Sequence, residues 1–181
     1  MAQPIRVMGI CGTYDLDSAN GRMLEIILSQ CKDLGAEVST WDHGAYPLPL
    51  VGAEGSWEDE NVKNFQAMAT DSDAYILSSP EYHGTMSGVM KNSLDWLYSK
   101  HTSGKIFGLV STLGGQSSNN TLNHMRIAAR WIHGWVAPEQ VAIPHIKEAF
   151  SEDGSILDES IMSRISALST SVVENSIKLR R

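Results

Sequence analysis

The chain of 181 residues is 42% hydrophobic and 19% charged, which is typical of one globular domain with a single buried core, here expected to span residues 1–181. Its 14 basic and 21 acidic residues give a net charge of −7, which argues against a nucleic-acid partner because such proteins present a basic face to phosphates. No leader of basic and apolar residues and no run of about 18 apolar residues occurs, and Cys11 and Cys31 both lie in apolar segments. We therefore expect a cytoplasmic protein with no disulfide framework and no membrane partner.

Short apolar runs alternate along the chain with longer segments of helical period. In the first helix, apolar residues recur at i, i+3, i+4 and i+7 from Leu24 to Cys31, and Gly35 stands where helices commonly end. The expected strands are residues 5–11, 37–42, 73–79, 105–112 and 136–143, and the expected helices are residues 18–34, 57–70, 86–98, 116–133 and 157–179. This alternation predicts an α/β fold, a doubly wound parallel sheet with helices on both faces. Ligands of such folds bind beyond the carboxyl ends of the strands, so the loops after the first, third and fourth strands are the candidate site.

The first candidate loop, residues 12–20, runs from the first strand into the first helix. Its hydroxyl and amide side chains, Thr13, Ser18 and Asn20, can simply cap the helix or can also bind an anion at its positive end. For this segment alone the two interpretations are equally open. The loop carries neither the G-x-G-x-x-G dinucleotide motif nor a Walker G-K-[ST] motif.

The loop after the third strand carries the strongest signal. Residues 78–97 read S-S-P-E-Y-H-G-T-M-S-G-V-M-K-N-S-L-D-W-L. Pro80 and Gly84 favour a loop whose backbone groups can face a planar ligand, and Tyr82 offers an aromatic wall. Thr85 and Ser87 can cap the following helix.

This stretch resembles the P-E-Y-[NH]-G/x-[ST]-x-x-G-x-[LM]-K-N-x-x-D-W signature of the NADPH-dependent FMN reductase family, which includes flavin, quinone, chromate and azo-dye reductases. The resemblance implies a flavodoxin-like three-layer sandwich with five parallel strands in the order 2-1-3-4-5. It further implies an NAD(P)H-dependent FMN or quinone reductase with FMN as cofactor and NADPH or NADH as hydride donor. The implied partners are a small-molecule electron acceptor and further copies of the chain, in a homodimer or homotetramer.

The resemblance also implies which residues contact FMN. Thr13, Ser18 and Asn20 match the residues of the phosphate loop. Residues of the second loop match those that hold the isoalloxazine ring, and a glycine-rich turn, residues 111–116, matches the segment that approaches the pyrimidine end of the ring. These implied contacts are Pro80, Glu81, Tyr82, His83 and Gly84 in the second loop, and Thr112, Gly114 and Gly115 in the third.

One position departs from the family pattern. The phosphate loop of similar proteins usually carries an arginine where this chain has Asp15. A carboxylate within about 4 Å of a phosphate would cost roughly 4 kcal/mol at a surface-like dielectric. Three alternatives follow: Asp15 points away, Arg22 supplies the positive charge, or the flavin is held loosely.

Several residues allow a second interpretation. His83 is expected to contact the flavin edge or solvent, with a role as a catalytic acid as the alternative. His124 and His133 are nine residues apart on one predicted helix, a spacing that gives no shared face, so we expect no metal site. Cys11 is expected to be a small buried hydrophobe, with a redox role as the alternative.

Large aromatic residues cluster in the helices that follow the third and fourth strands. In the resembled family these helices form the dimer, so we expect an interface there; packing in the core and a ligand platform are the alternatives. Lys91 and Asp95, at i and i+4, can pair along one helix or across the interface. The aromatic residues concerned are Trp96, Tyr98, Trp131 and Trp135.

The expected mechanism is ping-pong: NAD(P)H reduces the flavin and leaves before the acceptor enters. The flavin supplies the redox chemistry and the protein supplies orientation and electrostatics, so no catalytic side chain is assigned. The alternative is an FMN-binding electron carrier or redox sensor without significant NAD(P)H oxidase activity.

Overall fold

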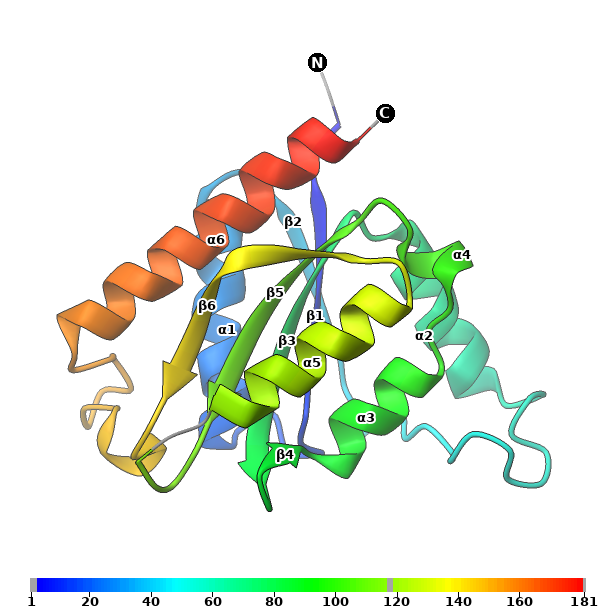
Figure 1. Ribbon diagram of the computed structural model, residues 1–181, viewed down its shortest axis with the longest axis horizontal. Coiled ribbons are helices and arrows are strands. Elements are labelled where there is room, and N and C mark those ends of the chain that lie inside the picture. The colour runs from blue at the N-terminus through cyan, green and yellow to red at the C-terminus, as the bar shows by residue number, and fades with distance from the viewer. Residues whose placement is uncertain (1–2, 117–118, 181) are drawn as a thin grey trace.

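The computed structural model describes residues 3–116 and 119–180, which fold into a central sheet covered by helices on both faces (Figure 1). Five parallel strands lie in the order β2-β1-β3-β5-β6. Because β5 and β6 are the fourth and fifth expected strands, the predicted order 2-1-3-4-5 is confirmed. The strands are β1 (Arg6–Cys11), β2 (Glu37–Trp41), β3 (Ala74–Tyr82), β5 (Ile106–Thr112) and β6 (Trp135–Ile143).

Two apolar clusters, one on each face of the sheet, form the core. One lies between the sheet and the helices α1 (Ala19–Asp33) and α6 (Glu159–Leu179). The other lies beneath α2 (Glu60–Asp71), α3 (Gly88–Asp95) and α5 (Asn119–Trp131). Gly108 of β5 lets α6 approach closely, because a Cβ there would lie 2.9 Å from the side chain of Val172.

The helices begin where the sequence supplies acceptors for their free amides. Ser18, Asp59, Ser87 and Asp158 each accept a hydrogen bond from a backbone amide in the first turn of the helix that follows. The helix expected from residue 57 therefore starts only at Glu60. Trp57 stays in the preceding loop.

The expected helix over residues 86–98 is wrong at both ends. It begins at Gly88 and ends at Asp95, and a short helix, α4 (Ser99–Thr102), follows. Residues 85–86 instead form a two-residue strand, β4 (Thr85–Met86), which pairs antiparallel with the end of β3. Residues 117–118, which fall in the expected helix over residues 116–133, lie outside the described residues.

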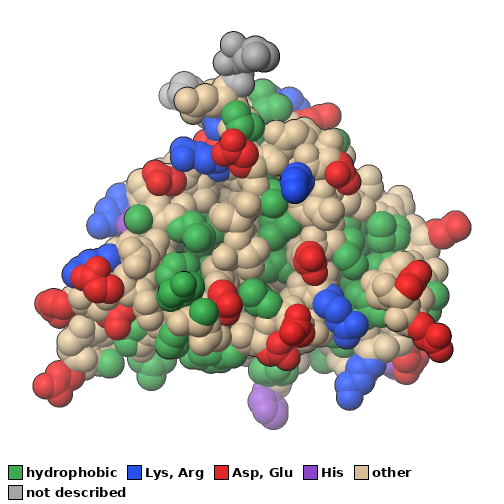
Figure 2. Space-filling view, turned by 180° about the vertical axis from the view of Figure 1, so that it is seen from behind, with side chains coloured by type: hydrophobic (Ala, Val, Ile, Leu, Met, Phe, Trp, Pro, Cys, Tyr) green, Lys and Arg blue, Asp and Glu red, His purple; other side chains and the backbone are tan. Residues whose placement is uncertain are grey.

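The first and last described residues lie near each other beyond the amino ends of the strands (Figure 1). Arg180 pairs with Asp73 and donates to the carbonyl oxygens of Gln3 and Pro4 at 2.6 and 2.7 Å. On the face shown in Figure 2, acidic and basic side chains are interspersed and no extended basic patch forms. Across the part of the chain that the structure describes, no helix has the length and apolar character needed to cross a membrane.

Candidate functional site

Three loops meet at the carboxyl end of the sheet because β1, β3 and β5 are neighbours in it. Cys11 at the end of β1 lies beside Ser78 of β3, and Pro80 of β3 lies beside Thr112 of β5. The segments that follow these strands are therefore adjacent, as the sequence predicts. A short 3-10 helix, η1 (Ile146–Glu148), follows β6 at the same end.

The first loop is closed by hydroxyl groups at the start of α1. Thr13 Oγ1 lies 3.1 Å from Ser18 Oγ and donates to the carbonyl oxygen of Asp15 at 3.0 Å. Ser18 Oγ accepts from the amide of Gly21 at 3.2 Å and so caps the helix. Within the described residues, no hydrogen bond occupies the backbone amides of Ala19 and Asn20. A capped helix start with free amides suits an anion.

The side chain of Asn20 faces the sheet rather than the loop. Its Nδ2 donates to the carbonyl oxygen of Ser78 at 2.8 Å, and its Oδ1 accepts from Ser78 Oγ at 3.0 Å and from Thr112 Oγ1 at 3.3 Å. Asn20, Ser78 and Thr112 are all buried. These bonds tie the first loop to both other strands, so Asn20 and Thr112 contribute to the site by holding its parts together.

The two charged side chains considered for the phosphate loop, Asp15 and Arg22, each make a contact of their own. The carboxylate of Asp15 is exposed and accepts from the amide of Asp17 at 2.8 Å, within its own loop. The guanidinium of Arg22 lies over the ring of Phe150, 4.9 Å from its centre. The guanidinium of Arg22 thus packs on an aromatic ring. The groups that the first loop offers to a ligand are hydroxyl groups and backbone amides.

The second loop is a tight hairpin rather than an open loop, because β3 continues to Tyr82. His83 and Gly84 form its turn with φ angles of 52° and 80°, the left-handed pair typical of a type I′ turn. Tyr82 and His83 are exposed at the tip, whereas Pro80 is buried at the base. The side chain of Glu81, one of the implied FMN contacts, accepts from the amide of Thr121 at the start of α5 at 3.2 Å.

Ser87 connects the second loop to the first. Its hydroxyl caps α3 by accepting from the amide of Met90 at 3.1 Å and donates to the carbonyl oxygen of Gly12 at 2.6 Å. A Cβ on Gly12 would lie 2.9 Å from that hydroxyl, so only glycine fits at this crossing. Thr85, the other expected cap, lies in β4 instead.

The third loop leaves open space beside its glycines. Leu113 and His145 anchor it through backbone bonds to Ile143 and Gly115, at 3.0 Å each. Among the described residues, which leave out 117–118, a Cβ on Gly114 would meet no atom within 4 Å, and one on Gly115 would meet only the side chain of Leu113, at 3.8 Å. A planar ligand can therefore approach the backbone of this turn directly.

The three loops lie in a part of the chain that matches a known protein family. The model of the NADPH-dependent FMN reductase family matches residues 5–148, which include all three loops. The chain belongs to this family. It is an NAD(P)H-dependent FMN reductase, and its cofactor is FMN.

Individual members of the family and proteins of the same fold agree with this assignment. An FMN-dependent NADPH-azoreductase of Staphylococcus aureus is 30% identical over 151 residues, which cover 81% of this chain and 80% of the relative. The structure of FerB, a flavoenzyme NAD(P)H:(acceptor) oxidoreductase from Paracoccus denitrificans, matches with a TM-score of 0.79 at 22% identity over 96% of this chain and 98% of that one. An archaeal flavodoxin matches with a TM-score of 0.65 at 12% identity over 97% and 99%. The two structural likenesses support the flavodoxin-like fold.

The loops of this FMN reductase fit the cofactor. The free amides at the start of α1 suit the phosphate, the hairpin tip exposes Tyr82, and Gly114 leaves room for a flat ring. Cys11 is fully buried and its Sγ lies 3.1 Å from Thr13 Oγ1, so it supports the first loop as a small core residue. When bound, FMN supplies the redox chemistry of the reductase.

His43, which the sequence analysis did not single out, packs against the first loop. It is buried, its Nε2 donates to Ser93 Oγ at 3.1 Å, and its ring packs edge-to-face against Tyr14 of the first loop, 6.0 Å between centres. Ser93 Oγ itself donates to the carbonyl oxygen of Val89, which is why the imidazole is the donor in this pair. Burial lowers the pKa of His43 to about 4, against a smaller opposing effect of Asp42.

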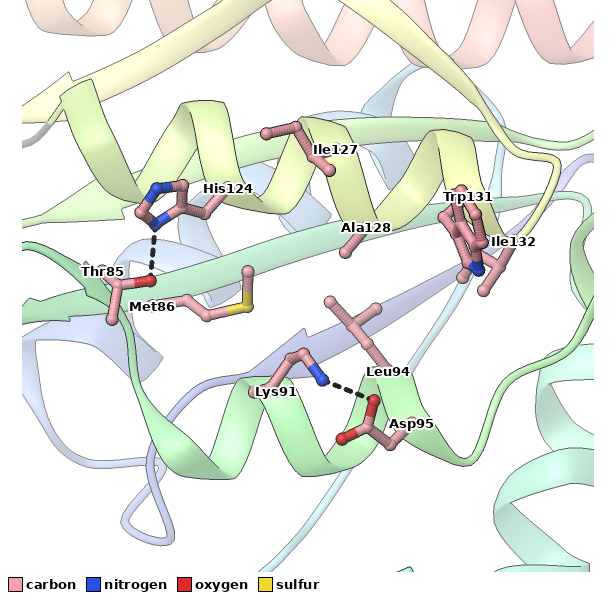
Figure 3. A pocket seen from close by; sticks show the side chains of 10 residues that line it. All are labelled: Thr85, Met86, Lys91, Leu94, Asp95, His124, Ile127, Ala128, Trp131 and Ile132. Atoms are coloured by element: carbon pink, nitrogen blue, oxygen red, sulfur yellow. Dashed lines mark hydrogen bonds and ion pairs between the residues drawn. The ribbon is translucent and has the colours of Figure 1, made fainter.

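A long groove leads away from the hairpin between α3 and α5 of the reductase (Figure 3). It has a volume of about 440 Å³, and its walls are mainly apolar. Lys91 and Asp95 pair along α3 at 2.6 Å on its lower side (Figure 3). The lining residues are Thr85, Met86, Lys91, Leu94, Asp95, His124, Ile127, Ala128, Trp131 and Ile132.

The four aromatic residues expected at an interface divide into two groups. Trp131 and Trp135 are exposed, and Tyr98 is partly so. For Trp96 the expectation is wrong: it is fully buried, donates to the carbonyl oxygen of Pro49 at 2.8 Å and packs edge-to-face on Trp57. The loop before α2 covers it, and no local sequence pattern indicates that contact.

Proposed function

We propose that this reductase transfers electrons from NAD(P)H to a small acceptor in a ping-pong sequence. The acceptor classes proposed are a flavin, a quinone, an azo compound or a metal oxyanion. Azo compounds are included because the Staphylococcus aureus relative is named an azoreductase. Bound FMN would supply the two-electron chemistry, and the protein groups bind, orient and shield.

The first loop is proposed to hold the phosphate of FMN. The hydroxyls of Thr13 and Ser18 and the free amides at the start of α1 are neutral or partially charged donors. Asn20 positions this loop through its bonds to Ser78 and is proposed to contact the phosphate through its backbone only. Because Arg22 packs on Phe150, exchange of the cofactor should be readier than in relatives with an arginine in the loop.

The second and third loops are proposed to hold the isoalloxazine ring. The backbone from Pro80 to Gly84 lies along one edge, with Tyr82 and His83 exposed at the tip. Gly114 and Gly115 offer backbone rather than side chains at the other edge. Amides fixed by the hairpin and the turn stabilise negative charge on a reduced ring without reorganising, so no side-chain acid or base is assigned.

The observation that carries this proposal is the meeting of a free helix start, a tight hairpin and an open glycine turn at one end of the sheet. The proposed ping-pong sequence is tested by initial rates, measured against NADPH concentration at several fixed concentrations of a quinone. Parallel double-reciprocal lines support two separate half-reactions at one site. Intersecting lines would show that donor and acceptor are bound together and would contradict the proposed sequence.

The groove between α3 and α5 is proposed to be the interface of a homodimer, or of a dimer within a tetramer. Trp131 is 85% exposed and Ile127 is 63% exposed on its rim, an unusual exposure for large apolar side chains on one helix. A second copy of the same surface would cover both residues.

A further inference from the structure

The hairpin at the second loop is too small to hold its own position. Strand β4 has two residues and pairs only through Glu81 with Met86 and Tyr82 with Thr85. Isolated two-stranded hairpins are marginal even when longer. Whatever the hairpin packs against therefore sets where its tip lies.

The first two turns of α5 supply that support through two polar contacts. On one arm of the hairpin, Glu81 accepts from the amide of Thr121 at 3.2 Å. On the other arm, Thr85 Oγ1 and His124 Nδ1 lie 2.6 Å apart (Figure 3). α5 thus contacts both arms of the hairpin, through Glu81 on one and Thr85 on the other.

We infer that His124 is a positioning residue for the hairpin. This inference rests on the proposed function, in which the hairpin binds the ring of FMN. By holding Thr85, it fixes the direction in which the turn at His83 and Gly84 presents its backbone to FMN. Its own side chain is exposed on α5, so its loss leaves the core of the fold intact. The effect of its loss should fall on cofactor affinity rather than on global stability.

The geometry of the imidazole makes this inference sharply testable. The nitrogen that meets Thr85 is Nδ1, the one closer to the backbone. The amide of asparagine places a polar atom at the position of Nδ1, whereas the amide of glutamine places one near Nε2. His124→Asn should therefore preserve the contact, and His124→Gln should lose it like His124→Ala.

The experiment measures the FMN dissociation constant by quenching of flavin fluorescence, with the melting temperature of each variant beside it. We expect His124→Ala, His124→Gln and Thr85→Val each to weaken FMN binding roughly three- to tenfold, the loss of one hydrogen bond, at an unchanged melting temperature. His124→Asn should bind like the natural protein. So should Asn123→Ala, a matched control at the neighbouring exposed position of α5.

The double variant of His124→Ala and Thr85→Val should bind FMN no more weakly than either single variant, because both remove the same contact. Additive losses, or equal affinities for His124→Asn and His124→Ala, would overturn the inference. Light scattering on every variant measures its oligomeric state. An unchanged oligomeric state shows that a loss of FMN affinity does not come from a disturbed interface in the groove between α3 and α5.

Hydrogen exchange of the backbone amides at residues 82–86 tests the inference without flavin. Faster exchange there in His124→Ala than in Asn123→Ala supports the positioning role, and equal exchange overturns it. If the natural protein binds no FMN, the proposed function fails, and the exchange result alone decides whether His124 holds the hairpin.

Discussion

The side-chain amide of Asn20 donates a 2.8 Å hydrogen bond to the carbonyl oxygen of Ser78, 58 residues further along the chain. The same side chain accepts from Ser78 and Thr112, so one buried amide joins α1 to β3 and β5 directly beneath the site. The first loop and the strands that lead into the second and third loops are thereby fixed relative to one another.

Replacing Asn20 with alanine should lower the free energy of unfolding by about 2–3 kcal/mol, because it leaves buried polar groups of Ser78 and Thr112 without partners. Urea unfolding of Asn20→Ala measures this, with the exposed Ser29→Ala on the same helix as control. A loss below about 0.5 kcal/mol, within the range of ordinary surface substitutions, would contradict the role assigned to Asn20.

Asp15 should weaken the binding of FMN but not of riboflavin, which lacks the phosphate. Asp15→Arg is expected to tighten FMN by about tenfold or more by adding charge-assisted hydrogen bonds. Asp15→Asn is the matched control, because it removes the charge and keeps an acceptor for the amide of Asp17. Equal changes for both flavins, or none for either, would mean that the Asp15 side chain acts away from the phosphate.

Trp131→Glu should convert the protein from a dimer to a monomer, because it places a charge in the apolar groove between α3 and α5. Light scattering at micromolar concentration measures the change. Trp135→Glu, at a similarly exposed tryptophan outside that groove, is the control and should leave the dimer intact. A natural protein that is monomeric, or a dimer unaffected by Trp131→Glu, would contradict the proposed interface.

Stability should fall on acidification because of His43. Its pKa is lowered from 6.5 to about 4 by burial, so below pH 6.5 the unfolded chain takes up a proton that the folded chain does not. The folded state should therefore lose up to roughly 3 kcal/mol as the pH falls from about 6.5 to about 4. His43→Gln, which keeps a donor to Ser93, should show a smaller loss over that interval in urea unfolding. His101, whose pKa burial also lowers to about 4, should account for part of what remains.

Periodicity and turn residues predicted the parallel sheet and the approximate positions of most helices, because both depend on local patterns of burial. The strand order was implied by the resemblance to the reductase family. The hairpin was not predicted because His83 adopts a left-handed conformation, which is uncommon for any residue other than glycine. The glycine that follows, with two residues between Tyr82 and Thr85, was the available signal. The buried place of Trp96 and the packing of Arg22 on Phe150 depend on contacts across long stretches of chain, which no local pattern contains.

The claim that the hairpin holds the FMN ring is tested most directly by FMN binding to Gly84→Val. Valine at φ 80° is strained and crowds the turn, so binding should weaken by at least about tenfold. Gly35→Val is the matched control, because Gly35 has a φ of 88° and, among the described residues, a Cβ there would meet no atom within 4 Å; it lies at the end of α1, far along the chain from the hairpin. We predict normal FMN affinity in Gly35→Val and lost affinity in Gly84→Val; normal affinity in both would contradict this placement of the ring.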